Sequence, residues 1–88
     1  MSDALRKQKN RILWKCRQGT RELELVLCSF AEFHYDSLSL KDRHNFDRFL
    51  DFSSADLTSW LLLGSDTYAE CFAELVEQIR SFKLVSNN

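Results

Sequence analysis

The residues best suited to chemistry in this chain lie close together, between Arg11 and Glu22. This twelve-residue segment holds four cationic side chains, one tryptophan and the first of only two glycines. Arginine and tryptophan are enriched at the energetic centres of protein contacts. Gly19 can adopt positive φ at little steric cost, so it permits a sharp change of direction after a helix. The segment therefore predicts a rigid corner that displays charged groups to another macromolecule, rather than a catalytic centre.

The predicted contact surface consists of seven residues around this corner. On a helical wheel of 100° per residue, Trp14 points away from the apolar side of the first helix, so it either anchors an interface or packs under a later helix. The helix dipole favours Glu22 in the first turn of the second helix, and the same carboxylate could meet a partner's arginine. Arg21 could pair with Glu22 or Glu24. The predicted partner-binding residues are Arg11, Trp14, Arg17, Gln18, Gly19, Arg21 and Glu22.

No set of residues has the spacing of a catalytic or metal-binding motif. A phosphate-binding loop, a dinucleotide fingerprint and a nucleophile motif are all missing from the sequence. The three cysteines are odd in number and form no C-x-x-C pair, which indicates free thiols, most of them packed as small apolar groups. His34 and Cys28 would not face each other on one helix, so no zinc site is expected. We therefore expect neither a catalytic residue, nor a metal, nor a stably bound cofactor.

Length and composition favour one folded domain that spans residues 1–88. A chain of 88 residues buries a thin core and has little volume for a deep catalytic pocket. The longest apolar run, Trp60 to Leu63, is far too short to cross a bilayer, and no secretory signal is recognisable. These features predict a cytoplasmic protein that does not insert into membranes.

Charge is distributed unevenly along the chain. Residues 1–21 hold seven Lys/Arg and one acid, whereas residues 22–88 hold five Lys/Arg and twelve acids. A basic arm on an acidic body favours an anionic partner surface, although a solvated helix face explains the same pattern. The basic arm could also contact nucleic acid through phosphates, but the pI of about 6.1 and the downstream acids argue against a bound duplex.

Hydrophobic periodicity and capping residues predict an all-α, compact, single-domain five-helix bundle. The stripe of the second helix, at helical spacing, consists of Leu23, Val26, Leu27, Phe30 and His34. Clean alternation of apolar and polar residues, the signal of a strand, does not occur. The ends, at about residues 1–8 and 84–88, are expected to fray. The predicted helix starts are Ser2 or Asp3, Thr20, Ser39 with Asp42, Ser53 or Ser54, and the capping box Thr67–Glu70, and Gly19 and Gly64 are the predicted stops.

The order of these features resembles a known family over about residues 8–80. The segment from Arg11 to Glu24, the stretch Tyr35–Ser39 and the stretch Asp56–Leu61 resemble the signature of the succinate dehydrogenase assembly factors, in their bacterial SdhE-like form. The resemblance implies a five-helix bundle without enzymatic activity, located in the bacterial cytosol. It also implies binding to the flavoprotein subunit of succinate dehydrogenase, and in bacteria often of fumarate reductase, to assist covalent attachment of FAD to a histidine of that subunit.

The functional surface of that family is an Arg-Gly-x-x-Glu motif. Its glycine corresponds to Gly19 and its glutamate to Glu22, while Gln18 occupies the place of its arginine. Glutamine keeps hydrogen-bonding groups but lacks the permanent charge and the bidentate fork. Arg17 or Arg21 could supply the cation instead. Two other interpretations stay open at this point: an antitoxin-like or generic protein-interaction regulator, and a small nucleic-acid-binding domain.

Overall fold

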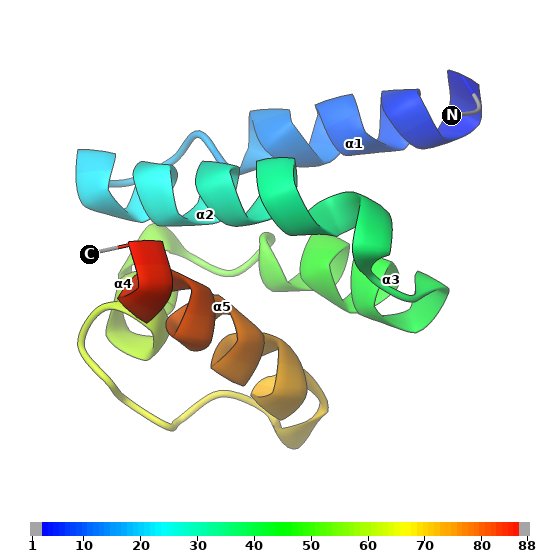
Figure 1. The fold of residues 1–88 in the computed structure, drawn as a ribbon. Helices are drawn as coiled ribbons and strands as arrows, with labels where there is room; N and C mark the ends of the chain where they lie inside the picture. Colours follow the sequence, from blue (N-terminus) through cyan, green and yellow to red (C-terminus); the bar gives the residue numbers. More distant parts are fainter. Residues whose placement is uncertain (1–2, 87–88) are drawn as a thin grey trace.

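Five α-helices make up the fold, as the sequence predicted, and Figure 1 shows their arrangement. The computed structural model describes the backbone of residues 3–86 and the side chains of residues 3–82. Within these residues the structure has no strand. The α-helices are α1 (Asp3–Lys15), α2 (Arg21–His34), α3 (Leu40–Phe49), α4 (Ser54–Leu61) and α5 (Ala73–Ser86), with 3₁₀ turns η1 (Tyr35–Ser37) and η2 (Glu70–Phe72).

Three of the predicted helix starts are confirmed by side-chain caps. At each one a hydroxyl oxygen accepts a hydrogen bond from the backbone N–H three residues further on, at 3.1–3.2 Å. Such a bond satisfies one of the N–H groups that have no partner in the first helical turn. The capped starts are Thr20 for α2, Ser39 for α3 and Ser53 for α4.

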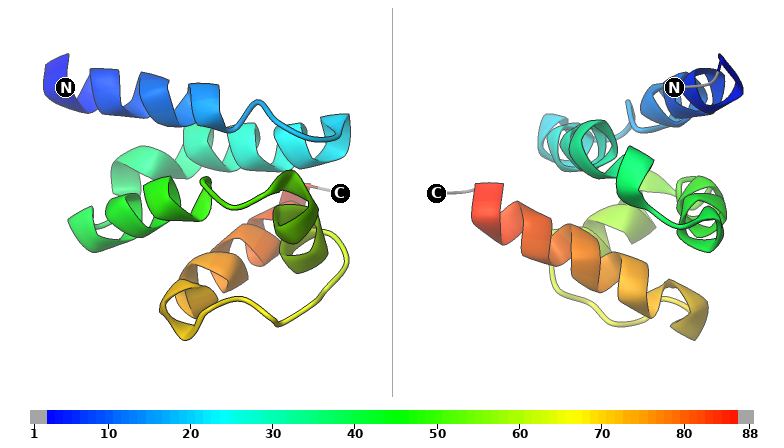
Figure 2. Two further views of the ribbon diagram at one scale, coloured as in Figure 1. Left: turned by 180° about the vertical axis from the view of Figure 1, so that it is seen from behind. Right: turned by 45° about the vertical axis from the view of Figure 1, so that its right-hand side comes forward.

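Helix α2 lies at the centre of the bundle. It packs against α1 on one side and against α4 and α5 on the other, and it runs antiparallel to α1 in both Figure 1 and Figure 2. Of its predicted stripe, Leu23, Leu27 and Phe30 are buried, whereas Val26 and His34 are half-buried. Phe30 meets Phe46 of α3 edge to face at 5.5 Å between ring centroids, a favourable aromatic geometry. The core therefore holds α2 rigidly, together with the corner that precedes it.

The predicted capping box at Thr67 and Glu70 is wrong. Helix α5 begins at Ala73, after the 3₁₀ turn η2, and neither start has a side-chain cap of that kind. The hydroxyl of Thr67 instead accepts a hydrogen bond of 2.8 Å from the indole N–H of Trp60. A buried indole N–H needs a partner, so this tertiary bond outweighs the local cap.

Both ends of the chain, where fraying was expected, are helical within the described residues. Residues 3–8 lie in α1, and Leu5 packs against the core. Residues 84–86 continue α5. The predicted cap at Ser2 and the tail at residues 87–88 lie outside the described residues.

Candidate functional site

The corner between α1 and α2 is exposed, which was the condition on which its predicted role depended. We define the α1–α2 corner as residues 14–22. Helix α1 ends at Lys15, and a hydrogen bond from the N–H of Arg17 to the carbonyl of Trp14 closes its last turn. Gly19 has φ +68° and directly precedes the cap Thr20 of α2, so it lies before the second helix rather than immediately after the first. The backbone of the corner is thus fixed from both sides.

Five of the seven predicted residues lie exposed on this corner. Trp14 is 73% exposed, so the alternative in which it packs under a later helix is wrong. The guanidinium of Arg17 lies 5.9 Å from the centroid of the Trp14 ring and 3.6 Å from the carboxylate of Glu24. An exposed pair of this length contributes little to stability. The five exposed corner residues are Trp14, Arg17, Gly19, Arg21 and Glu22.

The charges of Arg21 and Glu22 are available to a partner. Neither side chain forms an ion pair with another described residue. Glu24, which was a possible partner of Arg21, pairs with Arg17 instead. Both groups lie in the first turn of α2, on a backbone held by the Thr20 cap. A partner that hydrogen-bonds to both charges has to order two flexible side chains, but the backbone that carries them is already fixed.

Gln18 is turned inward and connects the corner to two other helices. Its side-chain N–H₂ donates to the carbonyls of Lys15 (3.0 Å) and Leu50 (3.3 Å), and its side-chain oxygen accepts from the hydroxyl of Ser54 (2.9 Å). These bonds use the polar atoms of the amide within the protein. Gln18 therefore positions the corner against the end of α3 and the start of α4.

Gly19 is required for close packing as well as for its backbone conformation. A Cβ at this position would lie 3.0 Å from a methyl carbon of Leu23 and 3.0 Å from the Cβ of Ser54. By contrast, a Cβ at Gly64, which has φ +80°, would meet nothing within 4 Å. The corner thus approaches α4 so closely that only glycine fits without displacement.

We expect Gly19→Ala to destabilise the fold more than Gly64→Ala. Both changes place a side chain in the left-handed region, at about 1–2 kcal/mol each. Only Gly19→Ala also crowds the buried Leu23, so we expect it to lower the free energy of unfolding by about 1 kcal/mol more, through overpacking. Urea unfolding of the two variants measures the difference. Equal decreases in the free energy of unfolding would show that the corner can move away from α4 without an energetic penalty.

Arg11 lies off the corner, in an ion-pair cluster that fixes α1 to α3. Its guanidinium is 2.7 Å from the carboxylate of Asp47, and the ammonium of Lys15 is 2.6 Å from the same carboxylate and 2.7 Å from that of Asp51. Burial alone would raise the pKa of Asp47, but hydrogen bonds from Lys15 and Arg11 outweigh it and lower that pKa. Burial alone would lower the pKa of Lys15, but hydrogen bonds to Asp47 and Asp51 outweigh it, so that pKa is raised. The cluster orients the helix that carries Trp14.

We expect Asp47→Asn to lower the free energy of unfolding by about 1–2 kcal/mol at neutral pH, because charge-assisted hydrogen bonds from two cations are lost. The lowered pKa of Asp47 means that the folded carboxyl is ionised more readily than the unfolded one. Its contribution is complete above the unfolded pKa of about 3.9 and disappears as the pH falls through the folded pKa. The difference in the free energy of unfolding between the wild type and Asp47→Asn should therefore become smaller below about pH 4.

Urea unfolding of the wild type and of Asp47→Asn between pH 2 and pH 7 tests this expectation. Asp56→Asn is the matched control, because Asp56 is exposed and has no ion pair among the described residues. A difference that stays constant down to pH 2 would contradict the assigned role of the Asp47 carboxylate.

Asp47 and Leu25 are the site residues that the sequence analysis missed. Asp47 is 36 residues from Arg11, and no local pattern connects them. Leu25 is 55% exposed and follows Glu22 by three residues and Arg21 by four, so it shares their face of α2. A leucine placed one helical turn after Arg21 and Glu22, outside the apolar stripe of the helix, was the sequence signal that could have identified it.

The described residues contain no competing chemical site. Burial raises the pKa of the Cys16 and Cys28 thiols, and an unreactive, packed thiol is what the sequence predicted for Cys16. Between residues 3 and 86 no three His, Cys, Asp or Glu side chains gather as metal ligands would. No helix in that range has the length and apolar composition to cross a bilayer.

Comparisons with known proteins agree with the resemblance seen in the sequence. A family model, Sdh5, described as flavinator of succinate dehydrogenase, matches residues 10–83. Similar proteins named FAD assembly factor SdhE occur in Serratia sp. (46% identity over 73 residues, 83% of each chain) and in Yersinia pseudotuberculosis (37% over 73 residues, 83% of each chain). Another, from Photorhabdus laumondii, is 38% identical over 79 residues, or 90% of this chain and 83% of the relative. No solved structure matches significantly.

Proposed function

We infer the mechanism of this protein from its family, because the chain belongs to the Sdh5 family of succinate dehydrogenase flavinators. Its function is FAD assembly, the promotion of flavinylation of succinate dehydrogenase. We propose that it acts by binding, without a catalytic residue of its own, and that its partner is the flavoprotein subunit. The observation that carries this proposal is the exposed corner, on which Arg21 and Glu22 have no ion-pair partner among the described residues.

In this proposal, Trp14 and Leu25 supply the apolar contacts and Arg17, Arg21 and Glu22 the polar ones. Gln18 and Gly19 hold the corner against α4 through Ser54, so the contact surface keeps one shape. A rigid surface loses little entropy on binding, and it can order the partner segment that bears the acceptor histidine. The flavin and its acceptor supply the covalent chemistry, and this chain supplies orientation.

Three further features belong to the proposal. The protein holds no FAD stably, works in the bacterial cytoplasm, and serves the flavoprotein of fumarate reductase as a second partner. Nucleic acid is not a partner in this proposal, because three of the four cations of α1 that would face phosphates are engaged by acidic side chains and only Lys7 has no ion pair among the described residues. The engaged cations are Lys9, Arg11 and Lys15. Phosphate binding would have to break these ion pairs.

The test is flavinylation in vitro. Purified apo flavoprotein subunit is incubated with FAD, with and without this protein, and covalent flavin is read as fluorescence in a denaturing gel. We expect fluorescence to rise several-fold when the protein is present. An unchanged signal with both the succinate dehydrogenase and the fumarate reductase subunits would refute the proposed action.

A further inference from the structure

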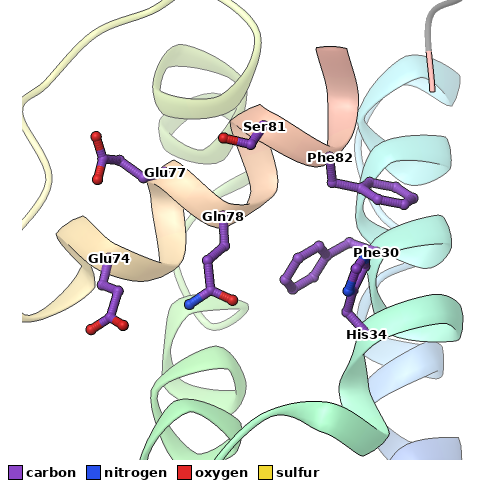
Figure 3. A pocket seen from close by; sticks show the side chains of 7 residues that line it. All are labelled: Phe30, His34, Glu74, Glu77, Gln78, Ser81 and Phe82. Atoms are coloured by element: carbon purple, nitrogen blue, oxygen red, sulfur yellow. The ribbon is translucent and has the colours of Figure 1, made fainter. Parts of the chain in front are cut away.

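A second recognition surface lies between α2 and α5. The structure has an open groove there of about 590 Å³, and Figure 3 shows its lining. Three aromatic rings from both helices form its floor: Phe30 stacks on His34 at 5.2 Å between centroids, and Phe82 meets the edges of both at 5.9 and 5.0 Å. The floor is therefore aromatic: the rings of His34 and Phe82 are partly exposed, and the buried Phe30 supports them from below.

Acidic side chains of α5 form the rim of the groove. Glu74, Gln78 and Phe82 follow each other at intervals of four residues, so they share one face of the helix, and Glu77 lies beside them. Neither Glu74 nor Glu77 forms an ion pair within the described residues, and the groove lining includes no lysine or arginine. The groove thus combines an aromatic floor with uncompensated negative charge.

Phe33 extends the apolar surface out of the groove. Its side chain is 75% exposed, although phenylalanine is ordinarily buried, and its ring lies 6.2 Å from that of Phe82. An aromatic side chain beside an apolar hollow is typical of binding anchors. Between Glu22 and His34 the axis of α2 advances about 18 Å, so the groove is a surface separate from the α1–α2 corner.

We propose that this groove binds a basic amphipathic helix of a protein partner. The apolar side chains of that helix cover Phe33, His34 and Phe82, and its lysines or arginines face Glu74 and Glu77. From Glu74 to Phe82 the groove is about 12 Å long, which corresponds to roughly two helical turns. A small ligand fits less well, because the groove is open and no buried side-chain polar atom among the described residues lacks a hydrogen-bond partner. This surface does not depend on the proposed function of the corner.

The test uses a labelled helical peptide of Leu and Lys, about 14 residues or roughly four turns long, and a Leu–Glu peptide as its acidic counterpart. Fluorescence anisotropy gives the affinity, and amide chemical shifts locate the site. We expect only the Leu–Lys peptide to bind, with shifts confined to the groove. Glu74→Gln with Glu77→Gln, and separately Phe33→Ala, should each weaken binding at least about tenfold.

The matched control is Glu32→Gln with Asp56→Asn, which removes the same charge from exposed positions outside the groove. It should keep the affinity within about twofold of the wild type, since rim charges act over short distances in salt. Equal weakening by both double variants would mean unspecific attraction to an acidic body and would overturn the proposal. So would a dimer of the free chain that Phe33→Ala dissociates, because a second copy would then be the occupant.

Discussion

Glu22→Arg is expected to weaken binding of the flavoprotein subunit at least about 30-fold, or roughly 2 kcal/mol, and to reduce flavinylation correspondingly. Glu22 is exposed in the first turn of α2 and has no ion-pair partner among the described residues, so its carboxylate is free to accept hydrogen bonds from a partner. Reversing its charge removes that acceptor and adds repulsion. The fold should change little, because the lost interaction with the helix dipole is about 0.3–1 kcal/mol.

Isothermal titration calorimetry with the purified subunit measures this effect, and thermal unfolding checks the fold. Glu32→Arg is the matched control, since it reverses an exposed charge on the same helix away from the corner. The control should bind like the wild type. If Glu22→Arg also binds like the wild type while both variants remain folded, the corner is not the contact surface.

Trp14→Ala is expected to weaken the same complex about 10- to 100-fold without lowering the melting temperature. The side chain is 73% exposed, so its removal creates no cavity in the core. In the complex, the loss would be the apolar contact area of the indole, because the contact of the indole with the Arg17 guanidinium is present in the free protein and is too exposed to add much to stability. Unchanged stability together with weaker binding would separate a contact role from a structural one.

Leu63→Ala is the control for Trp14→Ala. Leu63 is 74% exposed and follows α4, away from the corner, so it tests whether loss of any exposed apolar side chain impairs the protein. We expect normal binding and normal flavinylation. A Trp14→Ala variant that binds as tightly as Leu63→Ala would contradict the assignment of Trp14 as an anchor.

Local interactions explain which parts of the fold the sequence predicted. The caps at Thr20, Ser39 and Ser53 join atoms three residues apart, and the apolar stripe of α2 follows helical periodicity. The caps and the stripe both depend on residues close together in the sequence, so they can be predicted without the tertiary structure. The start of α5 was misread because Thr67 bonds to Trp60, a partner that its local pattern does not indicate.

The same distinction between local and tertiary interactions applies to the candidate site. The position of the corner and the positive φ of Gly19 followed from residue types and spacing, and the family followed from the resemblance of the motifs to a known signature. The exposure of Trp14 did not follow, because a helical wheel gives a direction but not what covers it. Gln18 was predicted to face a partner, yet its amide bonds to Ser54, which is 36 residues away.

The sequence by itself thus determined where the chain turns, which faces of its helices are apolar, and to which family it belongs. The tertiary structure alone decided which of the seven predicted residues are available to a partner, which position the corner, and where a second groove opens. The physical reason is that helix starts and stripes depend on neighbours within one turn. Exposure and pairing depend on side chains brought together from distant parts of the chain, such as Arg11 with Asp47 and Phe30 with Phe82.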